Sequence, residues 1–242
     1  MKPTLFISDL HLSPARPALV DAFRAFCSGP ARAAAGVYVL GDLFDSWIGD
    51  DQLREPVASA VANAIRDVAN AGTPVAVMVG NRDFLLGERF ARAAGATLLP
   101  EQIVVDVAGT PTLLLHGDEL CTGDAAYLRY RAFVREPWRQ RRFLALPYPL
   151  RRAVGHLLRG KSRRAVAVKP ERIMDVDGSA VEAAFRAAGV TRVIHGHTHR
   201  PARHHLVIDG RPCERWVLAD WYEHGSYLAF EAGGGRTYDV GM

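Results

Sequence analysis

Short apolar runs alternate with longer stretches of helical periodicity along the 242 residues of this chain. The apolar runs are rich in Val, Ile and Leu, as expected of strands that are buried on both faces. The predicted strands are residues 4–8, 37–40, 74–79, 103–107, 112–115, 192–194, 216–218 and 227–230. The predicted helices are residues 17–27, 55–71, 87–94 and 178–188. This alternation predicts an α/β architecture with α+β character, because an antiparallel tail is expected after His199.

The alternation stops between residues 125 and 172, where arginines are interleaved with aromatic and aliphatic side chains. Helical spacing extends over residues 125–136 and 150–159, and prolines separate the two stretches. No strand-like run occurs in this segment. We therefore expect one domain that spans residues 1–242 and carries residues 125–172 as a helical insertion, which lies like a cap over the α/β body.

The net charge of +4 hides a strong asymmetry. Residues 129–172 contain 14 Lys and Arg but 2 Asp and Glu, a local balance of +12, which leaves 16 basic and 24 acidic residues elsewhere, a balance of −8. A segment of this kind attracts anionic partners, such as nucleic acid, phospholipid headgroups or a phosphorylated substrate.

Cysteine use and hydropathy exclude several other classes of protein. Cys27, Cys121 and Cys213 lie far apart, so they predict neither a disulfide framework nor a zinc knuckle and fit a reducing compartment. The first apolar run is too short for a signal peptide, and no run approaches the roughly 20 residues of a membrane-spanning helix. We expect any contact with a membrane to be made through the protein surface.

Nearly every predicted strand ends in a residue that can bind a metal ion. Ligands of α/β proteins bind outside the carboxyl ends of the strands, so these side chains are expected to converge in one cleft. The candidate metal ligands are Asp9, His11, Asp42, Asn81, His116, His195 and His197. Asp, His and Asn without Cys favour divalent Mn, Fe or Zn. One carboxylate can bridge two ions about 3.5–4 Å apart, an arrangement suited to phosphoryl displacement.

Each motif also has a purely structural interpretation. A histidine near an acid, as in Asp9-x-His11, is commonly a satisfied pair, and residues 41–45 resemble a turn capped by an Asp. Asn81 after Gly80 is also typical of a turn. Three alternating histidines at residues 195–199 are harder to explain in this way. Because all the motifs occur together and each follows a predicted strand, the sequence favours the metal site.

These residues resemble, over nearly the whole chain, the motifs of the calcineurin-like metallophosphoesterases. The matching motifs are Asp9-x-His11, Gly41-Asp42-x-x-Asp45, Gly80-Asn81, His116 and Gly196-His197-x-His199. The resemblance implies a four-layer αββα sandwich with a di-metal centre. It assigns Asp9, His11 and His197 to one ion. It assigns Asn81, His116 and His195 to the other ion, with Asp42 bridging the two, and it implies that Asp45 and His199 orient these ligands.

Arg82 departs from the wider family, which usually has His after the ligand Asn. Arginine cannot donate its proton at pH 7 but binds phosphate oxygens in a bidentate way. We therefore expect catalysis to depend on Arg82 together with Asp42 and Asn81. In this scheme Arg82 stabilises transition-state charge, and the leaving group, such as a phosphate oxygen, needs no proton.

Longer strings resemble one subfamily, the UDP-2,3-diacylglucosamine diphosphatases of lipid A biosynthesis. The matching strings are residues 40–51, 80–87, 144–147, 173–176 and 196–201. The resemblance implies hydrolysis at the α-phosphate to UMP and 2,3-diacylglucosamine 1-phosphate (lipid X), with two Mn²⁺ ions per subunit. It also implies a peripheral enzyme on the cytoplasmic face of a bacterial inner membrane.

The resemblance also implies contacts to the lipid-linked UDP-sugar substrate. The implied contact residues are Asn81, Arg82, Asp124, Ser162, Lys169 and His195. Val166 stands where relatives have Asn, which removes one polar contact. Residues 148–159 predict an amphipathic basic helix of the kind that binds anionic bilayers. The insertion is also expected to bind the acyl chains of the substrate; the alternative is that apolar side chains such as Phe133, Trp138 and Leu157 only pack the insertion onto the body.

Two other functions remain open from the residues alone. One is a metallophosphoesterase that acts on nucleotides or nucleic acid, which the basic segment permits. The aromatic content of the insertion and Arg82 argue against it, so we expect no nucleic acid and no obligate protein partner. The other is a metal-free scaffold with the same fold. Such a scaffold is expected to lose ligands, whereas all seven ligand positions here carry competent side chains.

Overall fold

The structure is a computed structural model that describes residues 2–167, 175–222 and 224–240, with the backbone alone described at residues 161–167. One sheet contains β1 (Thr4–Ile7), β2 (Gly36–Leu40), β3 (Val75–Met78), β4 (Thr97–Leu98), β10 (Ser226–Glu231) and β11 (Gly234–Asp239). The other contains β5 (Gln102–Val107), β6 (Thr110–Leu115), β7 (Arg192–His195), β8 (Ala202–Ile208) and β9 (Arg211–Val217). Among the described residues, the strand orders are β11-β10-β1-β2-β3-β4 and β5-β6-β7-β9-β8.

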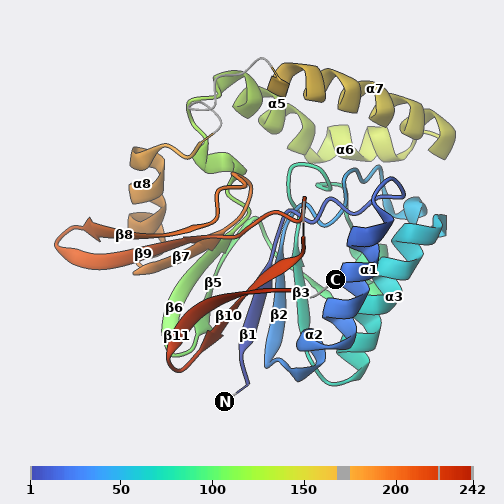
Figure 1. Cartoon of the computed structure of the whole chain (residues 1–242). Helices are drawn as coiled ribbons and strands as arrows, with labels where there is room; N and C mark the ends of the chain where they lie inside the picture. The colour runs from blue at the N-terminus through green and yellow to red at the C-terminus, as the bar shows by residue number, and fades with distance from the viewer. Residues whose placement is uncertain (1, 168–174, 223, 241–242) are drawn as a thin grey trace.

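Helices cover the outer faces of both sheets (Figure 1). The helices of the body are α1 (Pro17–Ser28), α2 (Pro30–Ala33), α3 (Pro56–Asn70), α4 (Glu88–Ala94) and α8 (Gly178–Ala188), with 3₁₀ turns η1 (Asp50–Arg54) and η2 (Asp118–Leu120). Three apolar layers hold the sheets and helices together. Phe6, Ile194 and Phe230 pack between the two sheets. Phe23 of α1 packs with α3 outside the first sheet, and Phe185 of α8 packs outside the second. The predicted four-layer αββα fold is confirmed.

Parallel strands bring the predicted ligands to one edge of the sandwich. β1, β2, β3 and β4 are parallel neighbours in the first sheet, and β6, β7 and β9 are parallel neighbours in the second. The loops that follow these strands are joined by backbone hydrogen bonds. The N–H of Asp9 donates to the carbonyl of Gly41 at 3.1 Å, and the N–H of Trp221 donates to the carbonyl of Asp9 at 3.2 Å. The second bond connects loops that belong to different sheets.

Residues 125–167, the described part of the insertion, form three helices that lie across this edge (Figure 1). They are α5 (Ala125–Arg135), α6 (Pro137–Leu144) and α7 (Tyr148–Ala167), and we call them the cap. The sequence predicted α5 closely, but α7 is longer than the predicted residues 150–159. We did not predict α6, because Pro137 was interpreted as a break. Pro137 instead occupies the first turn of the helix, where its missing N–H costs nothing.

The antiparallel tail is also confirmed, since β8 pairs with β9 and β10 with β11 in antiparallel fashion. The sequence analysis missed β8 and β11. Most residues of both strands are exposed, so they lack the continuous apolar run that was used to recognise strands. In the part of the chain that the structure describes, no helix has the length and apolar character needed to cross a bilayer.

Candidate metal centre

Strained backbone positions the candidate ligands at the strand ends. Seven described non-glycine residues have a positive φ, and five of them lie in the loops that follow the strands and hold the candidate ligands, which we call the strand-end cluster. These five are Asp9 (φ 55°), His11 (49°), Asp42 (53°), His197 (69°) and His199 (55°). Residues other than glycine adopt this region at a cost, and such strain persists only where the surroundings enforce it. Its concentration here marks the strand-end loops as the functional region.

Two glycines allow the loops to approach each other closely. A Cβ added at Gly80 would overlap Oδ1 of Asp42, and one added at Gly196 would overlap Oδ2 of Asp9. The glycines that precede Asn81 and His197 are therefore required by packing within the cluster.

The first group of candidate ligands contains Asp9, His11 and His199. Oδ1 of Asp9 lies 3.3 Å from Nε2 of His199, and Nε2 of His11 lies 3.4 Å from the same atom. One ligand atom from each of the three residues lies within 4.8 Å of the others, close enough to share an ion.

The second group contains Asn81, His116 and His197. Oδ1 of Asn81 lies 3.0 Å from Nε2 of His116 and 3.0 Å from Nδ1 of His197. Asp42 stands between the groups: its Oδ2 is 3.9 Å from Nδ1 of His11, and its Oδ1 is 3.8 Å from Nε2 of His116. Asp42 therefore lies near residues of both groups, and Asp9, Asp42 and His116 also have possible ligand atoms within 4.8 Å of one another.

The three alternating histidines are therefore arranged differently from the prediction. His199 was expected to orient other ligands, but it lies in the first group with Asp9 and His11, where the prediction placed His197. His197 instead lies in the second group with Asn81 and His116, where the prediction placed His195. His195 is the last residue of β7, and its ring turns toward the neighbouring strand β9. Its Nδ1–H donates to the carbonyl of Gly196 at 2.8 Å, and its Nε2 accepts from Nη1 of Arg215 at 2.9 Å.

The electrostatics of the cluster fit bound cations. Burial raises the pKa of Asp42 to about 7; Asp83 and Asp9 act in the same direction, and His116 opposes them. Within the described part of the chain, Nδ1 of His11 is buried and makes no hydrogen bond, whereas Oδ1 of Asp9 has the contact with His199 given above. Buried polar atoms are normally satisfied, so Nδ1 of His11 indicates a missing partner. Carboxylate, imidazole and amide donors suit a pair of divalent ions.

Two aspartates that the sequence analysis did not select support the ligands. Oδ1 of Asp83 accepts from the N–H of Gly80 at 2.7 Å and of Asp42 at 3.3 Å, which fixes two ligand loops to each other. Oδ2 of Asp220 lies 3.0 Å from Nδ1 of His199. Burial acts to lower the pKa of His199, but its contacts with Asp220 and Asp9 outweigh this and raise the pKa to about 10. Both aspartates lie a few residues after the end of a strand, and this position in the sequence could have identified them as candidates.

Asp45, the other predicted orienting residue, forms an ion pair with Arg159 of α7. This contact ties the loop after β2 to the cap. Asp124 is buried at the start of α5, where its Oδ1 accepts from the N–H of Tyr127 at 3.0 Å and caps the helix. Of the remaining predicted substrate contacts, Lys169 and the side chain of Ser162 lie outside the described residues, as does the side chain of Val166.

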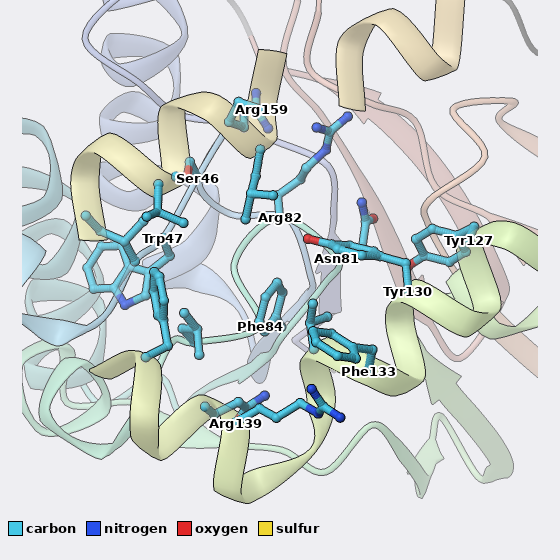
Figure 2. A pocket seen from close by; sticks show the side chains of 18 residues that line it. Ser46, Trp47, Asn81, Arg82, Phe84, Tyr127, Tyr130, Phe133, Arg139 and Arg159 are labelled. Atoms are coloured by element: carbon cyan, nitrogen blue, oxygen red, sulfur yellow. The ribbon is translucent and has the colours of Figure 1, made fainter. Parts of the chain in front are cut away.

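A pocket of about 260 Å³ lies between the cap and the body (Figure 2). Asn81 and Arg82 line it together with Tyr127 and Tyr130 of α5, and Figure 2 shows Asn81 beside the two tyrosines. Most of the other lining side chains are apolar. They are Trp47, Ile48, Phe84, Leu85, Phe133, Val134, Phe143, Val154 and Leu158. Tyr127 also stacks on His197, with ring centroids 6.2 Å apart, so the pocket opens beside the second group of ligands.

Several arginines of the cap form hydrogen bonds with the body, whereas others face solvent. Nε of Arg131 donates to Oδ2 of Asp118 at 2.7 Å. Nη2 of Arg135 donates to the carbonyl of Gly80 at 2.9 Å, and Nη1 of Arg151 donates to the carbonyl of Ile48 at 2.7 Å. Some of the positive charges that make up the local excess of +12 therefore dock the cap onto the body. From the sequence, this excess was expected to bind anionic partners.

Comparison with known proteins shows which family the chain resembles. The model of the calcineurin-like phosphoesterase family matches residues 2–201. A UDP-2,3-diacylglucosamine hydrolase from Xanthomonas oryzae is 49% identical over 238 residues, which cover 96% of this chain and 96% of its own length. A protein of the same name from Aromatoleum aromaticum is 48% identical over 230 residues, covering 95% and 94%, and one from Cellvibrio japonicus is 48% identical over 239 residues, covering 98% and 99%.

Among solved structures, a Thermus thermophilus protein aligns over 99% of both chains with a TM-score of 0.50 and 15% identity. A likeness at this identity supports the fold alone. The family model covers most of the chain, and the relatives match almost their full length at nearly half identity. This chain belongs to the calcineurin-like phosphoesterase family.

Proposed function

We propose that this protein hydrolyses UDP-2,3-diacylglucosamine at its α-phosphate, giving UMP and 2,3-diacylglucosamine 1-phosphate, a step of lipid A biosynthesis. The names of the relatives support this substrate. The observation that carries the proposal is the position of Asn81 and Arg82. Both residues line the apolar pocket, and Asn81 also contacts two candidate ligands, His116 and His197. A diphosphate joined to acyl chains needs phosphate-binding and apolar surfaces side by side in this way.

The ligand set follows from the two groups described above. We assign Asp9, His11 and His199 to one ion, and Asn81, His116 and His197 to the other. Asp42 bridges them. We propose Mn²⁺ because the resemblance to the UDP-2,3-diacylglucosamine diphosphatases implies it, and Asp, Asn and His donors without cysteine are compatible with it. When bound, two such ions polarise the phosphoryl oxygens and supply a nucleophilic water at neutral pH.

Arg82 is the residue we assign to the developing charge on phosphorus. Its backbone N–H donates to Oδ1 of Asp42 at 2.7 Å, which fixes it next to the bridging ligand. Its guanidinium reaches the pocket, where it can bind two phosphate oxygens. The leaving group is itself a phosphate, so the reaction needs no general acid at this position. His195 is assigned a supporting role, because both of its ring nitrogens are engaged by Gly196 and Arg215.

The outer face of the cap supports binding to a membrane surface. Leu150 and Leu157 lie seven residues apart on α7 and are 50% and 61% exposed. Arg152 is also exposed on this helix. An amphipathic helix with exposed leucines and arginines binds anionic lipid surfaces. We propose that the protein is peripheral at the cytoplasmic face of a bacterial inner membrane, where its substrate is presented by the bilayer.

Flotation with lipid vesicles tests this membrane proposal. We expect the protein to bind vesicles that contain phosphatidylglycerol and to bind pure phosphatidylcholine vesicles poorly. Replacing both Leu150 and Leu157 with Glu should weaken binding about tenfold or more, because each loses the burial of a leucine side chain. The control is Val207→Glu, which changes an equally apolar side chain that is 77% exposed on β8. Equal binding by both variants would contradict the assignment of α7.

Turnover of three substrates tests the function itself. With Mn²⁺, we expect rapid hydrolysis of UDP-2,3-diacylglucosamine, slow hydrolysis of UDP-glucosamine and none of single-stranded RNA. Hydrolysis in ¹⁸O-labelled water should place the label in UMP, because attack at the α-phosphate joins the water oxygen to that product. A preference for the non-acylated substrates would favour a different phosphoesterase. Label in the lipid product would contradict attack at the α-phosphate.

A further inference from the structure

An exposed tyrosine lies beside the first group of ligands, where the described pocket does not extend. Tyr222 follows β9 and is 45% exposed. Its ring centroid lies 5.6 Å from that of His11 and 5.4 Å from that of His199. The apolar pocket, in contrast, is lined by Asn81 and reaches the second group of ligands. The two groups of ligands therefore have different neighbours: an apolar pocket on one side and an exposed aromatic ring on the other.

A guanidinium lies against this tyrosine. Cζ of Arg16 is 4.2 Å from the centroid of the Tyr222 ring. The turn before α1 fixes the backbone of Arg16, because its N–H donates to the carbonyl of Ser13 at 3.0 Å. Nη1 of Arg16 is buried and, among the described residues, has no hydrogen-bond partner. A buried N–H donor without an acceptor is costly, so an oxygen of a ligand bound beside Tyr222 would relieve this cost.

We propose that Arg16 and Tyr222 form the subsite for the nucleoside monophosphate half of the substrate. This inference rests on the proposed function, which supplies a substrate with an acylated half and a uridine half. The acylated half occupies the pocket beside Asn81, so the uridine half extends past the first group of ligands. Arg16 donates to a phosphate oxygen, and Tyr222 provides an aromatic surface for the ribose and uracil. No residue of this pair was selected from the sequence.

Calorimetric titration of the Mn²⁺-loaded protein with UMP tests the subsite directly. We expect Tyr222→Ala and Arg16→Ala each to weaken UMP binding about tenfold, which corresponds to about 1.4 kcal/mol. Tyr222→Phe should bind UMP nearly as well as the unchanged protein, because the ring remains. Two matched controls should bind UMP unchanged: Arg24→Ala, an exposed arginine of α1, and Tyr238→Ala, an exposed tyrosine of β11.

The second product separates a subsite from general damage to the metal centre. Binding of 2,3-diacylglucosamine 1-phosphate should be unchanged in Arg16→Ala and Tyr222→Ala, whereas Phe133→Ala in the pocket should weaken it and leave UMP binding intact. Equal loss of both products in the Arg16 and Tyr222 variants would overturn the proposal, as would unchanged UMP binding. If the unchanged protein neither hydrolyses UDP-2,3-diacylglucosamine nor binds UMP, the proposed function fails as well. If the unchanged protein hydrolyses UDP-2,3-diacylglucosamine and binds UMP, and the Arg16 and Tyr222 variants bind UMP equally well, the subsite is wrong and the proposed function stands.

Discussion

The strand-end cluster and the cap both carry many charged groups, but these groups are buried in the cluster and mostly exposed or half-buried in the cap. In the cluster, Asp9, Asp42 and His116 are almost fully buried. In the cap, Arg151 is the one buried side chain among those described in α5–α7. Backbone bonds, strained φ angles and glycine contacts fix the cluster, whereas long arginine side chains that reach acids and carbonyls of the body attach the cap. Chemistry at phosphorus needs fixed ligands, while a lipid-bearing substrate needs a cover that can adapt.

Replacing the bridging ligand gives the sharpest test of this contrast. Asp42→Ala should lower turnover at least about a thousandfold, because two ions together contribute several kcal/mol to the transition state. The metal-free variant should remain folded but lose about 1–3 kcal/mol of stability, because the backbone N–H of Arg82 loses its acceptor. Steady-state assays and thermal unfolding measure the two effects. Asp21→Ala, an exposed change on α1, is the control; substantial activity in Asp42→Ala would refute the bridging role.

A pair of histidine variants tests how the ligands are assigned within the cluster. His199→Ala should lose one metal ion per subunit and more than about a hundredfold in activity, beyond the usual cost of an outer-shell group. His195→Ala should retain both ions and lose about tenfold, because it supports the loop through Gly196 and Arg215. Metal analysis after gel filtration distinguishes the two. The reverse result would restore the assignment made from the sequence.

Arg82 stands at the boundary between the two regions, so its replacement should affect catalysis and leave the metals in place. Arg82→Ala should lower kcat about a hundredfold, the usual cost of removing one donor to a transition-state oxyanion. Arg82→Lys should recover part of this, because it keeps the charge but loses the bidentate geometry. Arg89→Ala, an exposed neighbour on α4, should behave like the parent. Loss of bound metal in Arg82→Ala would show instead that Arg82 holds the ligand loop together.

The docking of the cap should be easier to weaken than the cluster. Arg151 donates to the carbonyl of Ile48 and pairs with Asp51. Arg151→Ala should cost about 2 kcal/mol of stability, because it removes a charged hydrogen bond and leaves the Ile48 carbonyl unsatisfied. It should also raise KM for the diacyl substrate more than it lowers kcat. Hydrogen exchange should quicken in α6 and α7 but not in the strands, whereas Arg141→Ala, an exposed cap variant, should change neither region.

The smallest expected effect is at the rim of the cap. Burial and the hydrogen bond to Glu55 raise the pKa of Tyr148 to about 12. Because the folded pKa is higher than the usual value near 10, this contribution to stability is present below pH 10 and is lost as the pH rises from about 10 to 12. The parent should therefore lose slightly more stability over this range than Tyr148→Phe. Tyrosinate absorbance that titrates near 10 at Tyr148 would contradict the contact.

The sequence predicted the layers of the fold and the strand ends that carry the ligands, since both follow from hydrophobic periodicity and motif order. The sequence could not show which of the three alternating histidines face the cluster, because this depends on the residue at which β7 ends. His195 is the last residue of β7, and the contacts of His197 and His199 are what favour these two as the candidate ligands. The partners of Arg131, Arg151 and Arg159 were also out of reach, because pairing between distant segments leaves no local pattern.

The tight contact between Gly80 and Asp42 has a consequence for drug resistance. Phe133 and Leu158 of the cap are exposed and line the pocket, so the fold tolerates their replacement and an inhibitor that depends on them can be escaped by single substitutions. Gly80 has no such freedom, because any side chain there would overlap Asp42. A compound that packs against Gly80 would therefore contact a position that cannot vary without displacing Asp42.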